Sequence, residues 1–202
     1  MGPLSAVPVP TLANSEGGLP SQVSVRSVIF VLLVVAAGAG VVRAERPRPL
    51  LSRPLVLPQV APNARCPLTQ SRSLVSHAET VGRAPVRLME VGGVTGAKID
   101  ISQSVPDSAG WRGQKTPWLV TRAYRGPLLI RGRRLDGPTG VRFAVGYGDH
   151  RTHLYWSRVP RRNRVAGYFG IPSSVLVRTS GCYGFQIDGS SFTERLVLRV
   201  VT

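Results

Sequence analysis

Short apolar or alternating runs recur throughout residues 65–202, separated by Gly, Pro, Asp or Asn about every eight to fifteen positions. This spacing is typical of β-strands joined by turns, and no segment shows the periodicity of a long helix. The pattern predicts nine strands, at residues 86–91, 97–103, 118–124, 128–134, 141–145, 154–159, 174–179, 182–187 and 195–201. Strands this short and numerous predict an all-β domain built as an antiparallel sandwich.

The clearest local prediction is a hairpin at the C-terminal end of the sequence. Residues 182–187 and 195–200 each place an apolar side chain at every second position, so each strand would have one apolar face. The two faces consist of Tyr183, Phe185, Ile187, Leu196, Leu198 and Val200. Asp188-Gly189 is expected to supply the positive φ angles of a tight turn between them. Two further hairpins are expected around residues 125–127 and 136–138.

A different kind of apolar run lies nearer the N-terminus, where residues 28–42 read VIFVLLVVAAGAGVV without a charge or a proline. Arg26 precedes this run and Val42-Arg43-Ala44 follows it, in the pattern of a signal peptide with a small-residue cleavage site. The run is short for a helix that must cross about 30 Å of hydrocarbon. Residues 23–44 are therefore predicted to be a signal peptide cleaved after Ala44. A single transmembrane helix retained as a membrane anchor is the alternative.

Residues 1–22 are polar and rich in Pro and Gly, which makes a leader unusually long for a signal peptide. Either translation starts at Val23 or Val25, or these residues form the disordered tail of an uncleaved anchor. In an anchor, the arginines that follow the apolar run outnumber Arg26, so the positive-inside rule would place the C-terminal domain in the cytoplasm. An exported domain therefore favours the cleaved signal.

Residues 45–64 contain five prolines and show neither helical nor strand periodicity. This composition favours extended polyproline II, and the segment is predicted to be a Pro-rich stalk or linker. The β-sandwich domain is then expected to span residues 65–202, a length sufficient for one sizeable core.

The sequence carries 26 Lys and Arg against 10 Asp and Glu, a formal net charge of +16. Only Lys98 and Lys115 are lysines, and this preference for Arg, with abundant Ala, Gly, Pro and Val, points to a GC-rich genome. The charge is spread along the predicted domain rather than held in a tail, which weakens a nucleic-acid-binding interpretation. A solvated basic surface is the simplest interpretation, and anionic wall polymer or lipid headgroups are the partners that suit it best.

Three motifs stand out along the domain: PWLVTRAYRGPLLIRGRRLDGPTGVRF at residues 117–143, SGCY at residues 180–183 and QIDG at residues 186–189. Over about residues 64–202 the chain resembles uncharacterised exported bacterial proteins that end in an immunoglobulin-like β-sandwich. The resemblance implies that fold and an exported location, and it brings no activity or ligand with it. No Trp follows Cys66 at the distance found in antibody domains, so their Cys-Trp-Cys core is not expected.

Cys66 and Cys182 are the only cysteines, and both lie in the predicted exported domain. An even pair in an oxidising compartment favours a disulfide, which would pin the first segment of the domain to its penultimate strand. Two buried free thiols are the alternative. A reactive thiol is disfavoured because the sequence places no His to activate either residue.

Metal and nucleotide chemistry find little support in the sequence. Asp149-His150 and His153 lie close together and His77 is remote, but real zinc sites have a more complete ligand set. We expect surface histidines, and we predict neither a metal nor a cofactor. Residues 92–98, GGVTGAK, have the wrong glycine spacing for a phosphate-binding loop, so a glycine-rich β-turn is expected there.

Aromatic residues flanked by arginines in the Gly-rich segment 146–170 form the one candidate binding patch. Its members are Tyr155, Trp156, Arg158, Arg161, Arg162 and Arg164. Aromatic and guanidinium groups together suit sugar stacking or contact with an anionic polymer. Packing beneath a long loop is the competing interpretation. Trp118 lies in an apolar run and is expected in the core.

These observations favour a non-catalytic cell-envelope module that binds or spaces something at the bacterial surface. An exported enzyme or inhibitor that acts on envelope polymer is the alternative, because a sandwich fold does not fix function. A third hypothesis is an anchored domain that contacts nucleic acid through its arginines, with an affinity that falls steeply with salt.

Overall fold

A computed structural model describes residues 49–75 and 78–202. These residues form fifteen strands and one short 3₁₀ helix, η1 (Leu50–Ser52), so the predicted all-β class is confirmed. The predicted signal peptide or anchor at residues 23–44, with its hydrophobic helix, and the leader before it lie outside the described residues. Within the described ranges, no helix is both long enough and apolar enough to span a membrane.

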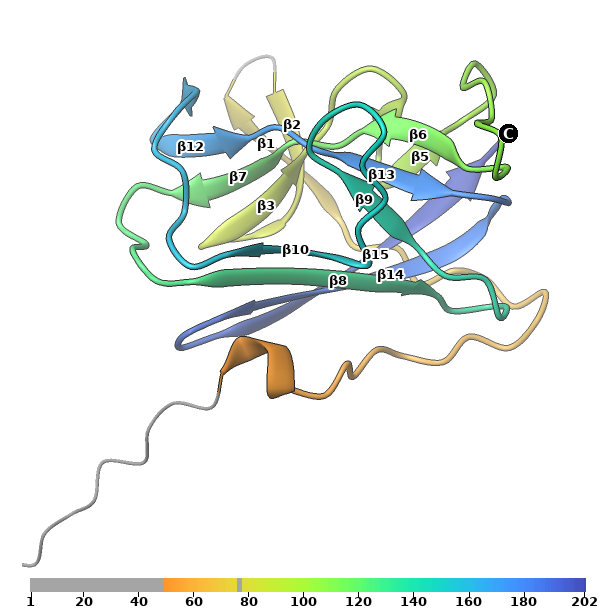
Figure 1. The fold of residues 1–202 in the computed structure, drawn as a ribbon, viewed down its shortest axis with the longest axis horizontal. Coiled ribbons are helices and arrows are strands. Elements are labelled where there is room, and N and C mark those ends of the chain that lie inside the picture. Colours follow the sequence, from red (N-terminus) through yellow and green to blue (C-terminus); the bar gives the residue numbers. More distant parts are fainter. Residues whose placement is uncertain (1–48, 76–77) are drawn as a thin grey trace, which may run out of the picture. The chain divides into compact units, whose positions relative to one another are not determined.

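Two six-stranded sheets form the layers of a sandwich, with a smaller third sheet beside them (Figure 1). The first sheet has the order β1 (Ser71–Val75), β2 (Ala78–Arg83), β3 (Val86–Met89), β7 (Trp118–Thr121), β12 (Tyr168–Ile171) and β11 (Arg164–Val165). The second has the order β10 (His153–Trp156), β8 (Leu128–Arg134), β14 (Gly181–Gly189), β15 (Thr193–Val201), β5 (Lys98–Asp100) and β4 (Val94–Thr95). The third contains β6 (Arg112–Lys115), β13 (Ser174–Val177) and β9 (Arg142–Ala144). Among these pairings only that of β15 with β5 is parallel.

The main core lies between the sheets and follows the alternation seen in the sequence. The six apolar residues predicted to line the C-terminal hairpin are all buried in one cluster. Trp118 is fully buried, as predicted, and its ring centroid lies 6.2 Å from that of Phe185. Because successive side chains point to opposite faces, the residues between the apolar ones on β14 form the outer face of the second sheet.

All nine predicted strands are present, and six others were not predicted. β6 reads RGQK and β1 reads SRSLV, so neither carries the apolar alternation that identifies a strand with one buried face. β12 reads YFGI and overlaps the end of the Gly-rich segment 146–170, in which only residues 154–159 are predicted as a strand. Strands of this kind are held by backbone pairing, which leaves little trace in the sequence.

The turns confirm one prediction and show that two others are wrong. Residues 92–98 do form a glycine-rich turn, in which Gly96 and Ala97 both have positive φ angles between β4 and β5. The C-terminal hairpin is different from the prediction, because Asp188 still pairs with Thr193 and the loop spans residues 189–192 without a positive φ. Residues 125–127 do not close a hairpin, since β7 and β8 belong to different sheets.

The predicted stalk is in fact part of the folded unit over its described length. Residues 50–66, called the strap below, run along the outer face of the second sheet (Figure 1). The backbone of the strap bonds to long side chains of that face: Arg131 Nη1 donates to Arg53 O at 2.7 Å, and Arg195 Nε donates to Val56 O at 2.7 Å. Val56 N–H donates to Gln186 Oε1 at 2.7 Å. A free polyproline II spacer would make none of these contacts.

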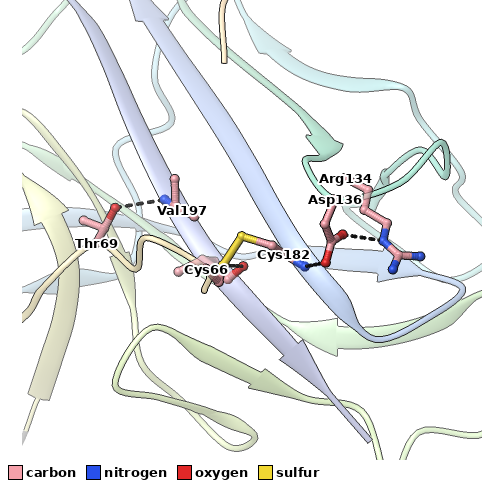
Figure 2. Close-up of a disulfide and its surroundings, with 7 residues drawn as sticks. Cys66, Thr69, Arg134, Asp136, Cys182 and Val197 are labelled. Carbon is pink, nitrogen blue, oxygen red and sulfur yellow. Dashed lines mark hydrogen bonds and ion pairs between the residues drawn. A yellow bond between two sulfur atoms is a disulfide. The ribbon is translucent and has the colours of Figure 1, made fainter. Parts of the chain in front are cut away.

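A disulfide joins Cys66 to Cys182, which confirms the predicted pair (Figure 2). Cys182 lies on the outer face of β14, and the bond packs in a small second cluster with Leu57, Leu135 and Val197. The disulfide of antibody domains instead joins the two sheets through the core. Here the bond fastens the end of the strap to the last hairpin.

Candidate anion-binding site

Two loops that cross between the sheets gather arginines at one end of the sandwich. Residues 122–127 connect β7 to β8, and residues 157–167 connect β10 to β12 by way of β11. Figure 1 shows both loops at the end of the sandwich opposite the C-terminus. They carry six exposed arginines and no acidic residue: Arg122, Arg125, Arg158, Arg161, Arg162 and Arg164. These two loops are called the basic end below.

The six guanidinium groups make no ion pair or hydrogen bond with any other described residue. The nearby acids of the β14–β15 hairpin are already engaged. Asp188 pairs with Arg131 at 2.8 Å, and Glu194 pairs with Arg83 at 2.8 Å. The positive charge of the basic end is therefore not neutralised locally, which is the condition for attracting an external anion.

A pocket of about 310 Å³ opens between the two loops. Phe169 and Val159 are buried and supply apolar walls, and Tyr124 adds a half-buried ring. The Tyr124 hydroxyl donates to Pro127 O at 2.5 Å and accepts from Ser190 N–H at 2.9 Å, so the ring is fixed in place. Three exposed arginines, Arg125, Arg158 and Arg161, complete the lining. The result is a small apolar depression with a cationic rim.

The structure separates the predicted patch into several parts. Tyr155 points outward from β10 and is 42% exposed, whereas Trp156 points inward and packs on the main core. Only Arg158 and Arg161 of the predicted six residues line the pocket, and Arg162 and Arg164 lie exposed on the same loop. The sequence gives no sign that Tyr124 and Arg125 join this segment, because the contact arises from a crossover between sheets.

A second cationic and aromatic cluster lies on the third sheet. The Arg178 guanidinium lies 4.6 Å from the ring centroid of Trp111, and that of Arg142 lies 5.6 Å from it. His150 meets the same ring edge-on and pairs with Asp107 at 3.0 Å. These arginines already stack on Trp111, so the cluster is better explained as packing of the loop at residues 145–152.

No group of three or more His, Cys, Asp or Glu side chains in residues 49–75 and 78–202 could hold a metal ion. His150 bonds to Asp107, and His153 Nδ1 lies 3.1 Å from the Thr152 hydroxyl. His77 lies outside the described residues.

Asp136 links the disulfide to the end of β8 (Figure 2). Its carboxylate accepts from Arg134 Nε at 2.6 Å and from Cys182 N–H at 3.0 Å. Burial raises the pKa of Asp136, but the hydrogen bonds from Arg134 and Cys182 outweigh burial and hold that pKa below its ordinary value of 3.8. The ionised form is thus favoured in the folded chain.

A pH dependence follows from this lowered pKa. A carboxyl group whose pKa falls on folding contributes stability above its unfolded pKa and loses it as the pH falls through the folded value. We expect Asp136→Asn to lower the free energy of unfolding by about 1–2 kcal/mol at pH 7, from the loss of charge-assisted hydrogen bonds. The deficit should shrink below about pH 3.8, the unfolded pKa of the group. Urea unfolding at pH 7 and at low pH measures both values, and an equal deficit at the two pH values would contradict this assignment.

Comparisons with known proteins add one structural likeness. No family model and no curated protein matches this chain. The chain is similar in structure to a crystal structure described as that of a putative lipoprotein from Bacillus anthracis, with a TM-score of 0.44 and 9% sequence identity. That match covers 69% of this chain and 88% of the other.

Proposed function

We propose that this chain is an exported, non-catalytic protein of the cell envelope, which uses its basic end to hold anionic groups of that envelope. The observation that carries the proposal is the set of six exposed arginines without an ion-pair partner among the described residues, around a pocket with apolar walls. Guanidinium groups bind phosphate and carboxylate oxygens through paired N–H donors, and local acids do not compete for them here.

Two features support the exported location. The apolar run at residues 28–42 has the pattern of a signal peptide. The Cys66–Cys182 disulfide suits an oxidising compartment, because disulfides are rare where thiols are kept reduced. The sequence resemblance to exported proteins with immunoglobulin-like domains is consistent with this location and stays a prediction.

The intact mass of the protein in the medium and in the membranes of its host tests this location. We expect a species that begins at Glu45 and lies two mass units below its reduced form. A full-length, membrane-bound species with two free thiols would contradict export, and the nucleic-acid hypothesis would replace it.

The binding role is tested with a soluble polyanion, inorganic polyphosphate, and the protein as isolated from its host. We expect Arg158→Gln/Arg161→Gln to weaken binding at least about tenfold and to reduce its salt dependence, because two phosphate contacts are lost. Arg65→Gln/Arg199→Gln is the matched control. These two arginines are exposed and lie beside the disulfide, at the opposite end of β14. Replacing both by glutamine removes the same charge as Arg158→Gln/Arg161→Gln. Equal losses in both variants would show that only net charge matters.

A further inference from the structure

We propose that the basic end faces an anionic lipid surface and that its pocket receives a phosphate-bearing headgroup. This inference rests on the proposed function and narrows its ligand from any envelope anion to a lipid. It follows from where the chain enters the folded unit, from how charge is distributed over that unit, and from the apolar walls of the pocket.

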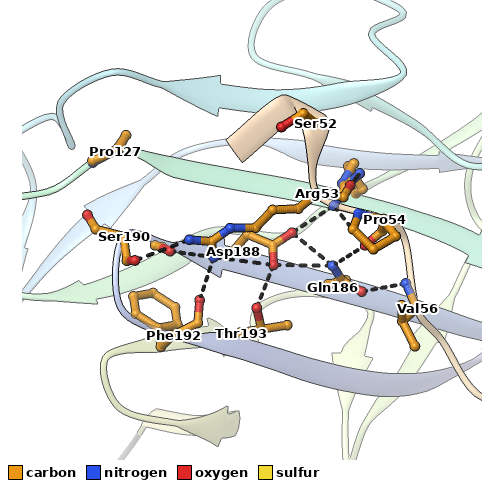
Figure 3. Close-up of polar contacts among 12 residues, drawn as sticks. Ser52, Arg53, Pro54, Val56, Pro127, Gln186, Asp188, Ser190, Phe192 and Thr193 are labelled. Carbon is orange, nitrogen blue, oxygen red and sulfur yellow. Dashed lines mark hydrogen bonds and ion pairs between the residues drawn. The ribbon is translucent and has the colours of Figure 1, made fainter. Parts of the chain in front are cut away.

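The strap begins at the basic end, and hydrogen bonds connect the two. Arg53 Nη2 donates to Ser190 O at 3.1 Å, and Ser190 N–H donates to the Tyr124 hydroxyl at 2.9 Å. Figure 3 shows Arg53 reaching the backbone of the β14–β15 loop at Ser190. Tyr124 in turn lines the pocket. The first described residues of the chain therefore lie beside the candidate site.

The sequence just before the strap adds to the charge of this end. Cleavage after Ala44 would leave residues 45–49 ahead of η1. Two of these five residues, Arg46 and Arg48, are basic, and each would strengthen attraction to anionic lipid.

Acidic residues are placed away from the basic end or are already paired. Asp136 follows β8, whose other end, Leu128, adjoins the basic end, and the seven residues of this strand span about 20 Å. Asp149 precedes β10, which runs toward the basic end. The basic end thus gathers six arginines that have no ion-pair partner among the described residues, and an anionic surface would orient the molecule by that end.

The pocket also has apolar surface that can contact the uncharged atoms next to a lipid phosphate. Val159 and Phe169 present apolar surface beneath the arginines, which suits the glycerol and first methylene groups next to a lipid phosphate. Leu51, on η1, is 54% exposed near the same end. A purely hydrophilic polyanion would gain nothing from these apolar groups.

Sedimentation with vesicles tests the proposal, using phosphatidylcholine alone and phosphatidylcholine with 30% phosphatidylglycerol. We expect tighter binding to the anionic vesicles and a loss of about 30-fold in Arg158→Gln/Arg161→Gln, from roughly fivefold per arginine near such a surface. Arg65→Gln/Arg199→Gln should bind like the unchanged protein. All variants share the same N-terminal residues, so the difference between them reports the basic end alone.

Hydrogen exchange on the vesicles identifies the docked face. We expect protection at residues 122–127 and 157–167, and protection at residues 145–150 instead would overturn the proposal. Equal affinity for the two vesicle types, with polyphosphate binding still dependent on Arg158 and Arg161, would refute the lipid ligand and leave the proposed function standing. Failure to bind either vesicles or polyphosphate would overturn both.

Discussion

Replacement of Asp188 by alanine is expected to lower the free energy of unfolding by about 3–5 kcal/mol, the cost of removing one partner from a buried ion pair. Asp188 is fully buried, and Arg131, which is 16% exposed, lies 2.8 Å from its carboxylate. Gln186 Nε2 and the Thr193 hydroxyl also donate to this carboxylate, at 2.9 and 2.7 Å (Figure 3). Without the carboxylate, the Arg131 charge would stay beneath the strap without a counterion.

Urea unfolding at neutral pH measures this effect, and Glu194→Ala is the control. Glu194 also pairs with an arginine at 2.8 Å, but that arginine, Arg83, is 77% exposed. Glu194 itself is 13% exposed, but its removal leaves only the hydrated guanidinium of Arg83 without a partner, so we expect the control to lose about 1 kcal/mol or less. Similar losses in the two variants would mean that burial does not determine the strength of the Asp188 pair.

Removal of the disulfide is the second change with a large expected effect. The cysteines are 116 residues apart, and the chain-entropy model gives about 4–5 kcal/mol for a loop of that length as an upper value. We expect Cys66→Ala/Cys182→Ala to lose about 3–5 kcal/mol, because the unfolded chain gains freedom and the outer cluster around Leu57 loses its tie.

Unfolding with and without a reductant provides the check. The reductant should destabilise the unchanged protein by a similar amount and leave the double variant unaffected. In the double variant, hydrogen exchange should also be faster at the backbone amides of Val56 and Val60, which donate to Gln186 Oε1 and Leu135 O. A loss below about 1 kcal/mol, with exchange at these amides unchanged, would show that the strap is held by its hydrogen bonds alone.

The sequence predicts the central strands well because their burial is one-sided. On β14 and β15 the inner face is apolar at every second residue, and that period identifies both strands. The strap has no such period, since its backbone bonds to the side chains of Arg131, Gln186 and Arg195 rather than to another strand. Its three prolines, Pro54, Pro58 and Pro62, are compatible with this arrangement because none needs an N–H group here, and the carbonyl oxygen of Pro54 accepts from Gln186 Nε2 at 3.0 Å.

For a related reason, the sequence predicts only part of the candidate site. Arg158 and Arg161 were identified because they stand near aromatic residues in the sequence. Tyr124 and Arg125 come from a loop more than thirty residues earlier, and only the crossing of both loops at one end brings them together. The predicted patch places the adjacent pair Tyr155 and Trp156 on one surface, but residues next to each other on a strand point to opposite faces.

The strap also sets the order in which this chain can finish folding. Its partners on β14 and β15 are synthesised long after it, and Cys66 must wait for Cys182, 116 residues later. A ribosome or a translocation channel releases the chain from its N-terminus onward, so the strap emerges long before the surface that it covers exists. The domain therefore cannot close until nearly all of it has been released. A chain that crosses a membrane unfolded is released before it folds, so this late closure does not delay it. A chain that folds during synthesis would instead leave its first segment unprotected until β14 and β15 appear.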